Sequence, residues 1–188
     1  MKVVFLDVDG VLNTERWIIE QYKKTGKPHS CHHSEFDPIC MNNLEKLVKE
    51  FDLKIVISST WRLGDHETDE GWNALMDRLN SIGIEDNVIG YTPNLSRKYQ
   101  SSCCRGHEIQ KWLDDNVDEN IENFVILDDD SDMFHLINKL AKCNFRDGLT
   151  ESVREKAAEI LQSLPAYTPE QMEQFRKNIK AKREKCFG

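Results

Sequence analysis

Short, mostly apolar runs of four or five residues alternate along this chain with longer amphipathic stretches. Runs of that length bounded by polar residues are typical of buried strands, and apolar residues that recur every three or four positions are typical of helices. The runs predict strands at residues 3–6, 53–57, 88–91, 124–127 and 142–145. The periodic stretches predict helices at residues 14–24, 37–51, 71–82, 105–113, 133–140 and 150–164.

The order of these elements determines the predicted fold class. Strands that alternate with helices form a mostly parallel sheet with helices on both faces, so we expect an α/β fold. The pattern predicts one domain over residues 1–164, with a small insertion or flap at about 14–36. Residues 165–188 predict a separate amphipathic helix with a basic outer side. That helix fits either a docked terminal helix with solvated lysines or a nucleic-acid patch.

Composition narrows the class of protein. The chain has 188 residues and a formal net charge of −8, so no overall basic field would attract nucleic acid, although a local basic patch is compatible with this charge. The six cysteines form no regular framework, and no apolar run approaches membrane-spanning length. These features lead us to expect a cytoplasmic protein with reduced cysteines. They leave its oligomeric state open.

Carboxylates follow directly after two of the predicted strands. Asp7, Asp9 and Gly10 follow the first strand, and Asp128 and Asp129 follow the fourth. The carboxyl ends of parallel strands meet at one edge of a sheet, so these acids should converge. A group of acids needs a compensating cation, and oxygen ligands favour Mg²⁺. A calcium loop starting at Asp128 is excluded, because its sixth and twelfth positions are not glycine and glutamate.

Hydroxyl and cationic side chains should approach the same edge. Ser58, Ser59 and Arg62 follow the second strand, and guanidinium groups bind anions with paired donors. Arg105 stands at the start of a predicted helix, where a cation is unfavourable unless an anion binds nearby. Donors that face a metal form a pocket for a tetrahedral oxyanion. We therefore predict phosphoryl transfer, with one carboxylate as nucleophile and another as acid and base.

These features resemble the four motifs of the haloacid dehalogenase-like (HAD) phosphohydrolase superfamily. The motifs are Asp7-Val8-Asp9-Gly10-Val11, Ser58 after an apolar strand, a basic residue before a long helix, and Leu127-Asp128-Asp129. The likeness spans about residues 2–150 and implies a Rossmann-like parallel sheet of five strands in the order 5-4-1-2-3. More narrowly, residues 58–62, 105–109 and 127–130 are similar to the phosphatase domain of Swiss army knife RNA-repair proteins.

The resemblance implies a role for each motif residue. Asp7 would be the nucleophile and Asp9 the general acid and then base; Ser58 would bind the phosphoryl group, Arg105 would neutralise it, and Asp128 and Asp129 would complete the Mg²⁺ site with Asp7 and Asp9. We expect Gly10, Ser59, Arg62 and Lys98 to contact the substrate. The superfamily usually has lysine in the third motif, so Arg97 and Lys98 compete with Arg105 for that role.

Several alternatives remain open from the sequence. His29, Cys31, His32, His33 and Cys40 allow a zinc site, although their spacing is irregular and polar flap residues are the favoured interpretation. The adjacent Cys103 and Cys104 allow a redox pair, although adjacent cysteines bridge poorly and two buried small residues are the favoured interpretation. The leading hypothesis is a Mg²⁺-dependent phosphomonoesterase with an open site that acts on nucleic-acid ends or another large phosphoester. The alternatives are a non-catalytic metal- and phosphate-binding module and a phosphatase of nucleotides or sugar phosphates.

Overall fold

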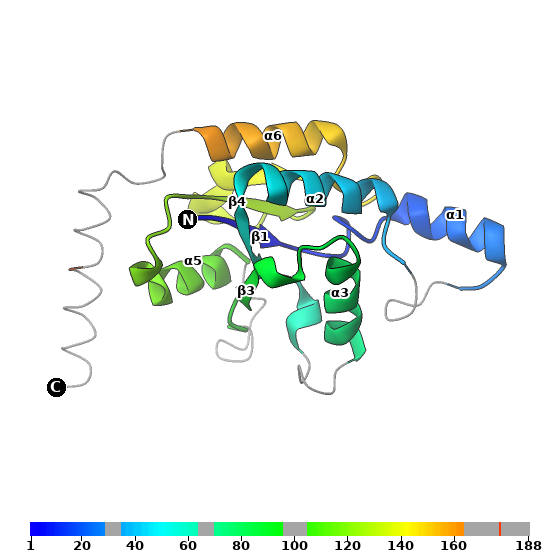
Figure 1. The fold of residues 1–188 in the computed structure, drawn as a ribbon, viewed down its shortest axis with the longest axis horizontal. Coiled ribbons are helices and arrows are strands. Elements are labelled where there is room, and N and C mark those ends of the chain that lie inside the picture. The colour runs from blue at the N-terminus through cyan, green and yellow to red at the C-terminus, as the bar shows by residue number, and fades with distance from the viewer. Residues whose placement is uncertain (29–34, 64–69, 96–104, 164–176, 178–188) are drawn as a thin grey trace.

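A five-stranded parallel sheet forms the centre of the molecule (Figure 1). The computed structural model describes residues 1–28, 35–63, 70–95, 105–163 and 177. The strand order is β3-β2-β1-β4-β5, which confirms the predicted order 5-4-1-2-3 and the Rossmann-like class. The strands are β1 (Lys2–Leu6), β2 (Leu53–Ile57), β3 (Val88–Tyr91), β4 (Asn123–Asp128) and β5 (Leu140–Lys142).

The central strands are apolar because both of their faces are covered. β1 lies between β2 and β4, and every residue from Val3 to Leu6 is fully buried. Buried parallel strands of this kind carry continuous apolar runs rather than an alternating pattern. Leu6 pairs with Ile57 on one side and with Leu127 on the other, so the three strands end at the same level. The residues that follow them therefore meet at one edge.

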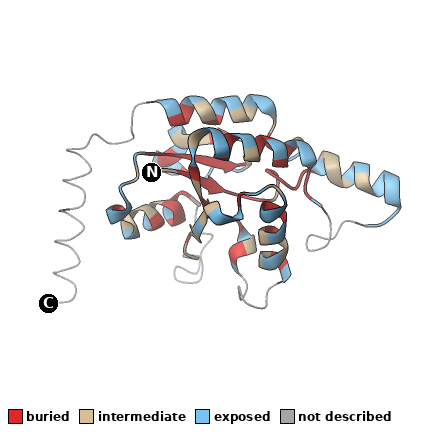
Figure 2. Cartoon of the chain, in the orientation of Figure 1, coloured by how far each residue is buried: buried red, intermediate tan, exposed pale blue. Residues whose placement is uncertain are grey.

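Helices cover the two faces of the sheet in two separate packing clusters. One cluster includes buried residues of α2 (Pro38–Phe51), α3 (Glu70–Ser81) and α6 (Glu151–Gln162). The other includes residues of α5 (Arg105–Asp115) and the 3-10 helix η4 (Phe134–Lys139). Short 3-10 turns also occur at η1 (Thr60–Leu63), η2 (Glu85–Asn87) and η3 (Val117–Glu119). In Figure 2 the buried residues follow the sheet and the inner sides of these helices.

The helix that follows the first strand projects from the rest of the domain. α1 (Glu15–Thr25) begins after the N-cap Thr14, ends at Gly26 in the left-handed conformation, and has no buried residue. Figure 1 shows it extending away from the sheet. The described part of the predicted insertion 14–36 thus contains one exposed helix. Residues 29–34, with the three histidines of the zinc interpretation, lie outside the described residues.

Of two predicted elements near the fifth strand, one needs correction. A short helix is expected at residues 133–140, and the structure has a 3-10 helix at Phe134–Lys139. The last strand was expected at 142–145, but it occupies Leu140–Lys142, where Leu140 pairs with Ile126 and Lys142 with Asp128. Phe145, the last residue of the predicted strand, is 53 % exposed and lies beyond the end of β5.

Two further findings concern membrane spans and the C-terminal segment. None of the helices in the described ranges is long and apolar enough to cross a membrane. Apart from Lys177, the predicted basic helix at 165–188 lies outside the residues that the structure describes, so the domain boundary near 164 stays a prediction.

A substitution at Gly106 tests how closely α5 packs against the segment that contains Met133. A Cβ atom at this position would lie 2.5 Å from the backbone oxygen of Met133, in the segment that follows β4. Replacing a helical glycine by alanine normally stabilises a helix by about 1 kcal/mol. We expect Gly106→Ala to lower the thermal midpoint of unfolding instead, because the backbone must move. A midpoint equal to or above the wild-type value in a calorimetric scan would contradict this packing.

Candidate active site

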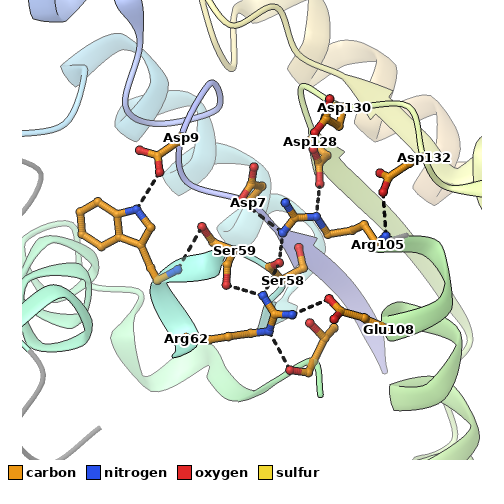
Figure 3. Close-up of polar contacts among 12 residues, drawn as sticks. Asp7, Asp9, Ser58, Ser59, Arg62, Arg105, Glu108, Asp128, Asp130 and Asp132 are labelled. Atoms are coloured by element: carbon orange, nitrogen blue, oxygen red, sulfur yellow. Dashed lines mark hydrogen bonds and ion pairs between the residues drawn. The ribbon is translucent and has the colours of Figure 1, made fainter. Parts of the chain in front are cut away.

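The first two acids leave β1 in different directions (Figure 3). Asp7 continues the strand: its backbone N–H donates to the Leu127 carbonyl at 3.0 Å, and the residue is only 5 % exposed. Asp9 lies in the following turn, where its carboxylate accepts from Asn13 Nδ2 at 2.8 Å and from Trp61 Nε1 at 3.0 Å. These two bonds fix the Asp9 side chain on the side of the turn that faces η1.

Three carboxylates form a cluster that could hold a metal ion. One oxygen each from Asp7, Asp128 and Asp129 lies within 4.8 Å of the others. Gly10 makes this approach possible, because its φ is +76° and a Cβ there would lie 2.5 Å from Asp129 Cγ. The cluster does not include the Asp9 carboxylate, which is bonded elsewhere, so its predicted role as a metal ligand is not supported by this placement.

Ser58 and Ser59 form the loop between β2 and η1. Ser58 continues the sheet, with its N–H donating to the Leu6 carbonyl at 2.9 Å, and is fully buried. Its hydroxyl oxygen has no hydrogen-bond partner among the described residues. The Ser59 hydroxyl accepts from the Trp61 backbone N–H at 3.5 Å, and its interaction with Asp7 acts to lower the pKa of that carboxyl. The structure therefore brings both predicted serines next to the β1 acids.

Arg105 reaches the acids from the first residue of α5. Its backbone N–H donates to Asp132 Oδ2 at 2.9 Å, which anchors the helix start. Its Nε lies 3.0 Å from Asp128 Oδ2 and its Nη1 lies 3.5 Å from Asp7 Oδ1. Nη1 also donates to the Ser58 carbonyl. The guanidinium thus touches residues at the carboxyl ends of β1, β2 and β4, the edge of the sheet where the sequence predicted it.

The electrostatics of the site follow from burying like charges. Burial, together with the Asp7 charge, raises the pKa of Asp128 to about 7, although Arg105 opposes the shift. Burial also raises the pKa of Asp7 and of Asp129 above the usual range of a carboxyl. Burial alone would lower the pKa of Arg105, but Asp7 and Asp128 outweigh it and raise that pKa. The three carboxyl groups of the cluster therefore ionise less readily than three exposed aspartates would.

Arg62 lies beneath the serine loop rather than open to a ligand. Its Nε donates to the Thr92 carbonyl at 2.8 Å, its Nη1 donates to the Ser58 and Ser59 carbonyls, and its Nη2 pairs with Glu108. Burial lowers the pKa of Arg62, while the Glu108 charge opposes that shift. The guanidinium is placed among protein groups, so contact with a substrate anion remains a prediction that this placement does not favour.

Some site residues were missed by the sequence analysis, and others cannot be placed. Asn13, Trp61 and Glu108 contact predicted site residues but were not identified. Trp61 and Glu108 lie in the segments 58–62 and 105–109 that resemble the phosphatase domain, and Glu108 is also a charged residue beside Ile109 on the buried side of α5. Lys98 and the competing Arg97, like Cys103 and Cys104, lie outside the described residues. Cys40, the remaining residue of the zinc interpretation, is buried, and burial raises the pKa of its thiol to about 12.

Comparison with known proteins decides the family. A family model described as the HAD domain in Swiss Army Knife RNA repair proteins matches residues 3–153. The chain belongs to this HAD family. No curated protein and no solved structure matches it. Membership supports a hydrolase of the phosphatase type, in a superfamily that typically uses a divalent metal, and the acidic cluster agrees with such use.

Replacing Asp129 by asparagine tests whether the carboxylate cluster binds a metal ion. Burial, Asp7 and Asp130 all raise the pKa of Asp129, which means that its ionised form is disfavoured in the folded protein. We expect Asp129→Asn to raise the unfolding midpoint of the HAD domain by a few degrees in EDTA at neutral pH. The same variant should lose most of the stabilisation that wild type gains from millimolar Mg²⁺. An unchanged response to Mg²⁺ in differential scanning fluorimetry would contradict the metal assignment.

Proposed function

We propose that this chain is a Mg²⁺-dependent phosphomonoesterase that works through a phosphorylated Asp7. The observation that carries the proposal is the meeting of Asp7, Asp128, Asp129 and Arg105 at one edge of the sheet. Membership of the HAD family supports it independently. A site of this charge is suited to hold a cation and then a phosphoryl dianion.

The residues present fit a divalent cation. Asp7, Asp128 and Asp129 offer oxygen ligands within one another's reach, and the Gly10 turn leaves room for Asp129 that a side chain would fill. Burial and the Asp7 charge raise the pKa of Asp128 even though Arg105 opposes the shift, which supports a further cation at this cluster. These three aspartates would hold Mg²⁺, which would neutralise charge on the phosphoryl oxygens when bound.

Arg105 and Ser58 form the anion side of the proposed site. The Arg105 guanidinium already contacts Asp7, so a phosphoryl group bound to Asp7 would meet its N–H donors. The Ser58 hydroxyl, which has no hydrogen-bond partner in the described chain, would donate to a phosphoryl oxygen. Arg105 therefore fits the third-motif role by its contacts.

Two carboxylates have separate roles in the proposed reaction. A carboxylate oxygen of Asp7 attacks phosphorus and forms an acyl-phosphate bond, while the bond from phosphorus to the leaving oxygen breaks. Asp9, once protonated, gives its proton to that oxygen as general acid. Water then attacks phosphorus and passes a proton to Asp9. The bond between phosphorus and the Asp7 oxygen breaks, so Asp7 is restored as a carboxylate and inorganic phosphate leaves as the product. In the structure Asp9 is held by Trp61 and Asn13, close to Asp7 in the chain.

Asp7→Asn tests this mechanism. The change keeps the shape of the side chain and removes the attacking charge, so we expect kcat for an aryl phosphate to fall by roughly three orders of magnitude or more, with cooperative unfolding retained. Asp118→Asn, at an exposed acid of η3, is the control and should retain wild-type activity.

The outcome separates the leading hypothesis from its alternative. Activity retained by Asp7→Asn would refute the nucleophile assignment. If folded wild type showed no turnover with any divalent metal but bound inorganic phosphate, the chain would be a non-catalytic phosphate-binding module.

We further propose that the substrate is a large phosphoester, with nucleic-acid ends as the first candidate. The matching family is described from RNA repair proteins. The helix α1, which makes up most of the described part of the 14–36 insertion, has no buried residue and is too small to close over a substrate as a cap domain does. Near Arg105, the His107 ring stacks on Phe134, whose side chain is 54 % exposed, with ring centroids 4.7 Å apart. An exposed aromatic surface of this kind can stack on a base.

Substrate preference can be measured directly. We expect kcat/KM for an end-phosphorylated oligonucleotide to exceed that for a mononucleotide or sugar phosphate by about tenfold or more at low salt, and to decline as salt rises. An unphosphorylated oligonucleotide of the same sequence serves as competitor and should inhibit. Equal or higher kcat/KM for the small phosphates would favour the metabolite phosphatase instead.

A further inference from the structure

Arg62 joins three segments of the chain beneath the proposed phosphate pocket. Its Nη1 donates to the Ser58 and Ser59 carbonyls at 3.0 and 2.6 Å, after β2. Its Nε donates to the Thr92 carbonyl, after β3. Its Nη2 pairs with Glu108 of α5, and the side chains of both partners are more than nine-tenths buried. One guanidinium therefore links two strand ends to the helix that carries Arg105.

Glu108 connects the same helix to the chain beyond β3. Its Oε2 pairs with Arg62 and its Oε1 accepts from the Leu95 backbone N–H at 3.0 Å. Glu108 follows Arg105 by three residues on α5, so the two side chains emerge about one helical turn apart. The pair with Arg62 therefore holds the turn of α5 from which Arg105 extends.

The two arginines share an acceptor. The Ser58 carbonyl accepts from Arg62 Nη1 and also from Arg105 Nη1. Figure 3 shows Arg62 and Arg105 on opposite sides of this serine loop, with Asp7 beside Arg105. A shift of Arg62 would move the Ser58 carbonyl and, through it, the guanidinium that contacts Asp7.

We propose that the Arg62–Glu108 pair positions Arg105 and the Ser58–Ser59 loop for a tetrahedral phosphoryl group. This inference rests on the proposed phosphatase function and assigns Arg62 and Glu108 as positioning residues rather than residues that touch the substrate. Apolar residues of similar volume can replace a buried ion pair without loss of stability, so stability alone does not explain its presence. The need for a fixed geometry between the strand ends and α5 does explain the pair, because a small misplacement of an anion donor lowers the reaction rate considerably.

Glu108→Gln tests the inference. It keeps the size of the side chain and an acceptor for the Leu95 N–H but removes the charge opposite Arg62. We expect kcat/KM for an aryl phosphate to fall roughly 10- to 100-fold and the affinity for inorganic phosphate, measured calorimetrically with Mg²⁺, to fall in parallel. Asp115→Asn is the matched control, since it removes an acid from the exposed Lys111–Asp115 pair of the same helix. It should change neither quantity.

A double variant separates positioning from a general structural effect. If Glu108 acts through Arg105, Glu108→Gln should weaken phosphate binding in the wild-type background and add little further loss in Arg105→Ala. An equal loss in both backgrounds, or unchanged kinetics and phosphate affinity in Glu108→Gln, overturns the proposal. Arg62→Lys keeps the charge but loses the forked donors, and it should reproduce the loss. If neither Glu108→Gln nor Arg62→Lys folds, the pair is a folding element and the proposal is also overturned.

The proposed function and this inference can fail separately. If the wild-type chain shows no turnover, the phosphatase proposal is refuted. The phosphate affinities of wild type and Glu108→Gln then still test whether the Arg62–Glu108 pair positions the anion site. Normal turnover in wild type with normal kinetics in Glu108→Gln refutes the pair alone. A wild-type chain that neither hydrolyses phosphoesters nor binds phosphate refutes both.

Discussion

Asp7 and Asp128 lie side by side because β1 and β4 pair in parallel with Leu6 opposite Leu127. Their charges repel in a place where burial already disfavours ionisation, and the remaining features of the site reduce that cost. Arg105 contributes a cation between them. Arg105 in turn depends on the seating of α5, whose first N–H donates to Asp132 and whose Gly106 packs against Met133. The position of one helix therefore limits how two aspartates can coexist.

Much of the fold could be predicted because its signals are local. β2 and β3 have the predicted bounds, since each is a short apolar run that ends at polar residues. α2 begins after the predicted N-cap Asp37, with proline at its first position. β5 was misplaced for a physical reason: it has three residues at the edge of the sheet, and only Ala141 among them is buried. A strand that buries one small residue leaves almost no pattern.

The candidate site was predictable only in part. Asp7, Ser58 and Asp128 follow strands that could be identified, and parallel pairing brings strand ends together whatever the loops do. The contacts that hold these residues depend instead on side chains that are distant in sequence. Arg62 and Glu108, for example, are separated by 46 positions and have no spacing that marks them as a pair. A glutamate on the buried side of a helix indicates that a partner exists but does not identify it.

The excess of acid at this edge has a consequence for how ligands bind. Around the guanidinium of Arg105 lie Asp7, Asp128 and Asp132, and Asp129 completes the carboxylate cluster that could hold a metal ion. A phosphoryl dianion brought to this site alone would meet more negative than positive charge, whereas a divalent cation would be attracted by the same carboxylates and would offset their charge. Each ligand therefore lowers the cost of binding the other, and this coupling must be equal in both directions. Under the proposed function, the same carboxylates that are costly to bury would couple the binding of the cation to that of the phosphoryl group.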